Sequence, residues 1–149
     1  MHYRIEKFKM EHLDNYEPRE VQVKELEHLK KYMEHQHLWC HVLPIFTLFA
    51  DDKPVMLYGM SNNGFGTYTV MVFASEGVDK CTHTMVRCLY KYVEDFVGSD
   101  VKRFEAHVSM IDEPAKRLAK FFGFELIGIR RQATPNGDDQ GIYERLWRK

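Results

Sequence analysis

The stretch RFEAHVSMIDEPAKRLAKFFGFELIGIRR, Arg103–Arg131, indicates a strand, a helix and a second strand in succession. Its first part, Arg103–Ser109, is rich in strand-compatible residues, and apolar side chains recur there at every second position. This period places them on one face of the strand, and they are Phe104, Ala106 and Val108. The last part, Phe124–Arg131, resumes extended structure.

The middle of this stretch carries the start and stop signals of a helix. Asp112 can cap its first turn, because a carboxylate accepts hydrogen bonds from amides that have no partner inside the helix. Pro114 fits in the first turn, where a missing N–H costs nothing. Gly123 is predicted to end the helix with a positive φ, since glycine avoids the Cβ penalty. The apolar stripe between them is Ala115, Leu118, Ala119 and Phe122.

The rest of the chain predicts a first strand, a helix, three antiparallel strands and a long helix, with a closing hairpin at the end. The early helix has one apolar line, made of Val23, Leu26, Leu29 and Met33. A turn is expected at Ser61–Gly64, because Asn and Gly tolerate positive φ. The predicted ranges are Tyr3–Lys9, Glu20–His37, Leu43–Ala50, Val55–Met60, Phe65–Ser75, Val78–Val97 and, after the opening stretch, Gly141–Trp147.

Length and composition narrow the class of protein. A length of 149 residues suits one domain, placed at 1–149, with a real hydrophobic core. A net charge of −1 argues against general nucleic-acid binding, which needs a cationic excess. No apolar run reaches the ~20 residues that span a bilayer. Three cysteines without metal spacing suggest reduced thiols. We therefore expect a cytoplasmic protein without a membrane partner.

Four histidines lie close together in the sequence, at His28, His35, His37 and His41. The spacing of the last two could bridge one helical turn and hold a metal ion. Pro44 nearby and the missing carboxylate partner weaken that reading. Surface histidines at the end of an amphipathic helix explain the pattern better, so no metal site is predicted.

The C-terminal third resembles the GNAT acetyltransferase superfamily. The resemblance rests on Ala115, Leu118 and Gly123-Phe124-Glu125 in the helix and its end, then on Gly141-Ile142-Tyr143-Glu144-Arg145 in the final hairpin. It implies an α/β (α+β) fold with a mixed sheet, in which an antiparallel meander is followed by a crossover helix and a C-terminal hairpin. Thr67–Ser75 and Arg103–Ser109 would be parallel strands that splay apart around acyl-coenzyme A.

The same resemblance implies where the coenzyme would bind. Its pyrophosphate would need backbone amides at a helix start, where the helix dipole favours an anion. This chain offers Gly77 there but lacks the second glycine of the family's loop, and Glu76 and Asp79 add negative charge. An ordinary capped helix start remains the alternative. The predicted acetyl-coenzyme A contacts are Phe73, Gly77, Val78, Lys80, Cys81, Thr82 and Asp112.

The predicted catalytic residues are Glu105, His107 and Tyr143. Glu105 and His107 project from one face of the splayed strand, and histidine titrates in the useful range for a general base. The family often places a tyrosine as general acid where this chain has Ala119, and alanine cannot donate a proton. The remaining candidates for an acid are Tyr143, Tyr68 and His107. Each also has the simpler interpretation of a structural residue in the sheet.

Two functions follow from these residues. The first is an N-acetyltransferase that moves acetyl from acetyl-coenzyme A to an amine, on a small molecule or a protein. The second is a non-catalytic protein, because the degenerate loop and the missing tyrosine also resemble small GNAT-like proteins of T7-type bacteriophages, one of them an internal virion protein. That likeness implies a location in host cytoplasm or virion. A homodimer and virion partners are left open.

Overall fold

The structure is a computed structural model that describes residues 2–34 and 42–147, without the side chains of Tyr32, Met33, Gly77 and Asp79. Three of the four clustered histidines, His35, His37 and His41, lie outside the described residues. The helix predicted over Glu20–His37 is described as a 3₁₀ turn, η2 (Glu20–Gln22), followed by α1 (Val23–Met33).

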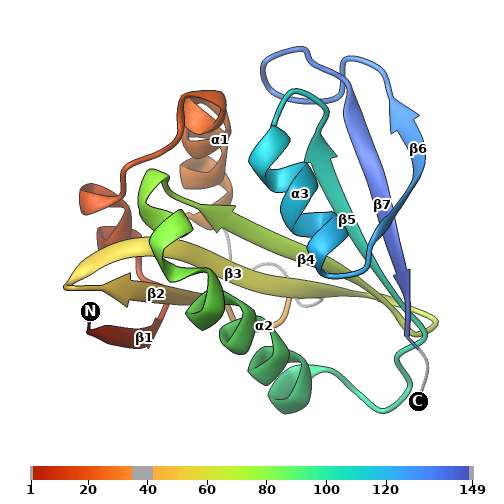
Figure 1. The fold of residues 1–149 in the computed structure, drawn as a ribbon, viewed down its shortest axis with the longest axis horizontal. Coiled ribbons are helices and arrows are strands. Elements are labelled where there is room, and N and C mark those ends of the chain that lie inside the picture. Colours follow the sequence, from red (N-terminus) through yellow and green to blue (C-terminus); the bar gives the residue numbers. More distant parts are fainter. Residues whose placement is uncertain (1, 35–41, 148–149) are drawn as a thin grey trace.

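Seven strands form one sheet in the order β1-β2-β3-β4-β5-β7-β6 (Figure 1). Neighbouring strands are antiparallel except for β4 and β5, which run parallel. The mixed sheet predicted from the sequence is thereby confirmed. The strands are β1 (Tyr3–Lys7), β2 (Phe46–Ala50), β3 (Lys53–Gly64), β4 (Thr67–Ala74), β5 (Arg103–Ser109), β6 (Glu125–Arg130) and β7 (Gln140–Leu146).

Helices cover both faces of the sheet. α2 (Thr82–Phe96) and α3 (Glu113–Phe121) lie in front of it in Figure 1 and bury the larger core, which includes Leu48, Met85 and Phe104. On the opposite face, η1 (Met10–Asn15) and α1 pack a smaller cluster of Leu13, Tyr16, Leu26 and Leu57. Because β2 and β3 are covered on both faces, they read as nearly continuous apolar runs.

Both ends of α3 confirm the predicted start and stop signals of this helix. Asp112 Oδ1 accepts a hydrogen bond from the Ala115 amide at 3.2 Å, which satisfies one free donor of the first turn. Gly123 has φ +81°, and its amide donates to the Lys120 carbonyl at 2.9 Å. Phe124 N–H then reaches back to Ala119, so the last carbonyls are paired and the chain turns into β6.

β4 and β5 pair only at their beginnings. The parallel register joins Thr67–Thr69 to Arg103–Glu105, and no pairing follows. Figure 1 shows β4 running to the left while β5 runs upward, so the two strands diverge toward their C-terminal ends. The divergence predicted from the sequence is therefore present.

Two sequence predictions about the ends of elements were wrong. The turn expected at Ser61–Gly64 is displaced toward the C-terminus: β3 continues to Gly64, which has the predicted positive φ (+85°), and the turn lies at Phe65 and Gly66, with φ +54° and +75°. The asparagines stay in β3 because Asn62 Oδ1 accepts from the Gly64 amide and Asn63 donates to Thr69. The helix expected from Val78 begins at Thr82, because a 3₁₀ helix, η4 (Glu76–Cys81), precedes α2.

Val23 departs from the predicted apolar line of the first helix. Its side chain is exposed, whereas Leu26 is buried. Helical spacing identifies a stripe but does not say how far the sheet beneath it extends, and Val23 lies in the first turn, at the margin of the smaller core.

Candidate active site between the diverging strands

A cavity of about 1110 Å³ occupies the space between the diverging strands. We call it the cleft. Val70, Val72 and Ala74 of β4 line one wall, and residues 106–109 of β5 line the other. Both strand segments lie beyond the last paired residues, so they present backbone amides and carbonyls toward the cleft.

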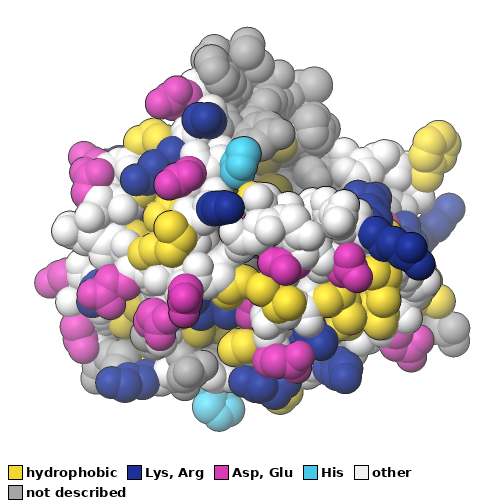
Figure 2. Space-filling model, turned by 90° about the horizontal axis from the view of Figure 1, so that it is seen from above, with side chains coloured by type: hydrophobic (Ala, Val, Ile, Leu, Met, Phe, Trp, Pro, Cys, Tyr) yellow, Lys and Arg dark blue, Asp and Glu magenta, His cyan; other side chains and the backbone are white. Residues whose placement is uncertain are grey.

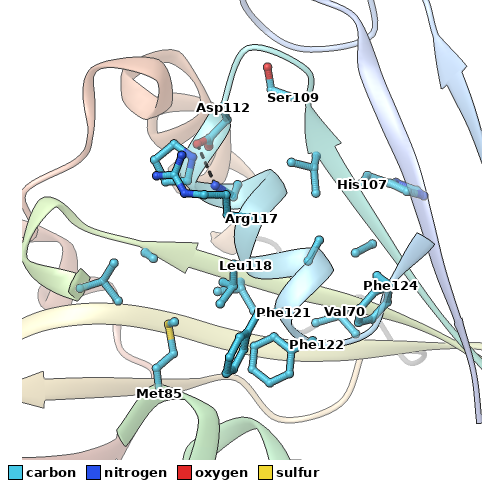
Figure 3. A pocket seen from close by; sticks show the side chains of 18 of the residues that line it. Val70, Met85, His107, Ser109, Asp112, Arg117, Leu118, Phe121, Phe122 and Phe124 are labelled. Atoms are coloured by element: carbon cyan, nitrogen blue, oxygen red, sulfur yellow. Dashed lines mark hydrogen bonds between the residues drawn. The ribbon is translucent and has the colours of Figure 1, made fainter. Parts of the chain in front are cut away.

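Apolar side chains from the helices close one side of the cleft. Figure 3 shows Leu118, Phe121 and Phe122 along α3, with Met85 of α2 below them and Val70 of β4 beside Phe122. The charged lining is mixed in sign: it includes Arg19, Arg117 and Arg145, but also Glu20, Glu25 and Glu76. Burial raises the pKa of the Glu25 carboxyl, and the nearby Asp112 charge acts in the same direction. On the face that Figure 2 shows, acidic and basic side chains are interspersed.

Arg19 bridges the two sides of the cleft at its open end. Its guanidinium donates to both carboxylate oxygens of Asp112, with Nη1–Oδ1 at 2.6 Å and Nη2–Oδ2 at 2.9 Å. Its Nε donates to the carbonyl of Ala74, the last residue of β4, at 3.1 Å. Only 15% of the Arg19 side chain and 9% of the Asp112 side chain are exposed. Asp112 is a predicted site residue, whereas Arg19 carries no signal in the sequence, since no local motif marks a partner 93 residues away.

The predicted pair Glu105 and His107 is in contact on the face of β5 opposite α3. Glu105 Oε1 lies 2.6 Å from His107 Nε2, and Glu105 Oε2 accepts from Arg103 at 2.5 Å. Arg103 also donates to Glu144 of β7 at 2.7 Å. The hydrogen bond from His107, aided by Arg103, lowers the pKa of the Glu105 carboxyl. His107 lines the cleft. Glu105 does not line it, but it contacts the His107 ring.

Ser109 is a further polar residue in the wall. It is 7% exposed and lines the cleft at the end of β5, as Figure 3 shows. Its Oγ has no hydrogen-bond partner among the described residues. A buried hydroxyl without a partner is unusual in a folded protein and is compatible with a polar ligand at this point.

The predicted phosphate loop has an unexpected form. Within η4, the Val78 amide donates to the Ser75 carbonyl at 3.2 Å, so that N–H is already used inside the helix. Val78 and Thr82 line the cleft, whereas Lys80 is exposed and outside its lining. The Cys81 side chain is buried in the larger core. Gly77 lies within η4.

Two predicted residues lie away from the cleft. Phe73 points to the opposite face of β4, where its ring centroid is 5.4 Å from that of Tyr16. Tyr143 is 1% exposed and does not line the cleft.

Of the other candidate acids, Tyr68 accepts a hydrogen bond from the Gly98 amide and donates to Asp100, which holds its side chain outside the cleft. Among the residues predicted as acid or base, which are Glu105, His107, Tyr68 and Tyr143, His107 is the one that lines the cleft.

No group of histidine, cysteine or carboxylate side chains suited to a metal ion occurs in residues 2–34 and 42–147. In the same part of the chain, no helix combines the length and the apolar character needed to cross a membrane.

Comparisons with known proteins identify the fold. The structure superimposes on Ard1 from Thermoplasma volcanium with a TM-score of 0.73, 12% identity and 99% coverage of both chains. A probable acetyltransferase from Staphylococcus epidermidis gives 0.72, 15% identity and coverage of 97% and 99%. The ribosomal-protein-S18-alanine N-acetyltransferase from Escherichia coli gives 0.64, 15% identity and coverage of 97% and 94%.

A further similar structure, from Desulfovibrio desulfuricans, is assigned to the GNAT family of acetyltransferases; its TM-score is 0.69, with 16% identity and coverage of 97% and 98%. The chain therefore has the fold of the GNAT acetyltransferases. Identities this low establish the fold alone. No family model matches the sequence, and no curated protein matches it.

Proposed function

We propose that the protein is an N-acyltransferase that moves acetyl from acetyl-coenzyme A to an amine. The observation that carries the proposal is the cleft itself, since two parallel strands part after three paired positions and leave their edges unpaired. In a packed sheet such edges are costly unless a ligand or water satisfies them. An extended thioester arm with amide groups is a ligand of the right shape and chemistry.

The residues present fit this arm. Val70, Val72, Ala106 and Leu118 offer an apolar channel, and the strand edges offer donors and acceptors for its amides. The residues near η4 fit the pyrophosphate of the coenzyme less closely, because the Val78 amide already donates to Ser75 and the acidic Glu76 lines the cleft. Arg117, in the middle of α3, is a cation in the lining that can pair with phosphate charge.

His107 is the proposed general base. Glu105 accepts from Nε2–H, which fixes the tautomer in which Nδ1 carries the lone pair. Among the described residues no group bonds Nδ1, so it can accept a proton from an attacking amine. The amine then forms the amide bond as the thioester C–S bond breaks, and one proton passes to the leaving sulfur.

The acceptor side is suited to a cationic amine. Glu20 of η2 and Glu25 of α1 line the cleft, and Glu25 lies near Asp112 at the start of α3. Carboxylates there attract an ammonium group, while the base removes a proton once it is positioned. Positioning of this kind accounts for a large part of catalysis by acyltransferases that form no covalent enzyme intermediate.

An acetyl-transfer assay tests the proposal. Purified protein is incubated with acetyl-coenzyme A and a panel of amines, and thiol release is measured together with the mass of the product. We expect His107→Ala to lower kcat by about 10²–10⁴-fold, as expected for loss of an acid-base group. His28→Ala, a change at an exposed histidine of α1, should leave the rate unchanged. Full activity of His107→Ala would exclude His107 as the base.

A non-catalytic protein with the same frame is the second candidate, and two observations favour it. Ala119 lines the cleft where the family often has its tyrosine acid, and Arg19 joins the walls of the cleft through Asp112 and Ala74. A virion or interaction role, including the phage origin considered from the sequence, belongs to this candidate. It predicts that acetyl-coenzyme A produces no heat on titration.

A further inference from the structure

The outer edge of the sheet at β6 is unusually apolar. β6 is the last strand in the sheet order, and among the described residues no strand pairs with its outer side. Leu126, Ile127 and Ile129 are 45%, 51% and 53% exposed. Figure 1 shows β6 at the right-hand margin, with α3 set inward over the sheet. An apolar edge without a neighbouring strand can serve as a template for another strand.

The opposite edge is protected in the usual way. β1 reads Tyr-Arg-Ile-Glu-Lys, so charged side chains interrupt its apolar ones. Such charges discourage pairing between molecules. β6 reads Glu-Leu-Ile-Gly-Ile-Arg, with its two charges confined to the ends and four uncharged residues between them. The two edges of one sheet therefore differ in a way that favours association at β6.

A β-bulge at Ile127 sets which residues of β6 share a face. Glu125, Gly128 and Arg130 lie opposite Glu144, Ile142 and Gln140, which are alternate residues of β7. Leu126 and Ile129 lie opposite Tyr143 and Gly141, on the other face. Without the extra residue, Glu125 and Arg130 would point to opposite faces, since they are an odd number of positions apart.

We propose that β6 pairs with β6 of a second copy of this chain, antiparallel about a two-fold axis at Gly128. In that register Glu125 of each copy faces Arg130 of the other, and Leu126 faces Ile129, on matching faces of the sheet. Each favourable pair occurs twice, because the interface is isologous. Gly128 allows close approach at the axis, where nothing lies within 4 Å of its ideal Cβ position.

Charge complementarity favours a second copy of this chain as the partner of β6, and it favours antiparallel over parallel pairing. Parallel pairing in the same register would place Glu125 beside Glu125 and Arg130 beside Arg130, which is repulsive. Antiparallel self-pairing places opposite charges together at both ends and apolar side chains between them. The strand is therefore complementary to itself. The inference does not depend on acyl transfer.

Sedimentation velocity across a concentration series tests the interface. The wild type should form a dimer, and Ile129→Lys should be monomeric with an unchanged melting temperature at low concentration. Arg130→Glu and Glu125→Arg should each raise the dimer Kd by about tenfold, since each change creates two like-charge pairs. The double variant Glu125→Arg/Arg130→Glu should restore the dimer.

A mixture of the two single variants provides the sharpest control. One copy then carries two acids and the other two bases, so the mixture should form a heterodimer although each variant alone is weakened. A monomeric wild type would overturn the proposal. So would a dimer that survives both single changes and Ile129→Lys, because it would form through another surface.

Discussion

Arg19 and Asp112 form a bidentate ion pair across the open end of the cleft, with N–O distances of 2.6 and 2.9 Å. Asp112 is also the N-cap of α3, and Arg19 also holds the end of β4 through the Ala74 carbonyl. One pair of side chains thus links the segment before α1, the first wall of the cleft and the helix after the second wall. We expect this link to stabilise β4 and β5 in the region where they diverge and no longer pair with each other.

Removing the arginine should destabilise the fold strongly. Arg19→Gln leaves the Asp112 carboxylate without its cation in a buried setting, which we expect to cost about 3 kcal/mol in the free energy of unfolding. Urea denaturation measures this. Arg4→Gln is a matched control, because Arg4 pairs with Asp52 at an exposed surface, where such pairs contribute about 1 kcal/mol or less. Equal losses in the two variants would contradict the structural role of Arg19.

Two substitutions of Asp112 separate its charge from its capping role. Asparagine still accepts the hydrogen bond from the Ala115 amide, whereas alanine does not. Both lose the ion pair, so Asp112→Ala should be less stable than Asp112→Asn by about 1 kcal/mol. The comparison uses urea midpoints at neutral pH. If the two variants are equally stable, the cap contributes nothing measurable.

Gly123→Ala should lower stability by about 1 kcal/mol. The penalty is conformational, since φ is +81° and an added Cβ would meet only the Arg145 side chain at 3.8 Å. Gly128→Ala in the monomeric Ile129→Lys background is the control, because the φ of Gly128 is not in the left-handed region and its Cβ would meet open space in the single chain. That change should be neutral or slightly stabilising. An unchanged melting curve for Gly123→Ala would argue against the conformation seen here.

The Glu105 carboxylate should make stability depend on pH in the acid range. Its hydrogen bond from His107 and the charge of Arg103 lower its pKa below the ordinary 4.5. A depressed pKa means that the stabilisation is present above the unfolded value and is lost as pH falls through the folded value. The difference in unfolding free energy between wild type and Glu105→Gln should therefore shrink from about pH 5.5 to about pH 3. A difference that stays constant over this range would contradict the stabilising role of these two contacts.

Local signals in the sequence predicted much of the fold. The cap at Asp112, the left-handed Gly123 and the parallel neighbours β4 and β5 follow from residues close together in the chain or from the strand–helix–strand order. The contact between Glu105 and His107 likewise follows from their shared face of one strand. What the sequence did not reveal depends on distant partners or on competing local bonds. The role of Arg19 depends on a distant partner, Asp112. The 3₁₀ helix η4 and the displaced turn at Phe65 depend on competing local hydrogen bonds.

Calorimetric titration with acetyl-coenzyme A tests the central claim, that the cleft between β4 and β5 binds an acyl thioester. The wild type should release heat with 1:1 stoichiometry, and a hundredfold excess over Kd should stabilise the fold by about 2.7 kcal/mol. Ala106→Phe, which places a ring in the cleft, should abolish the heat while the protein stays folded. Ala133→Phe, in an exposed loop, should bind like the wild type. Absence of heat and of thermal stabilisation in the wild type would contradict the account, and equal binding by Ala106→Phe would place the ligand elsewhere.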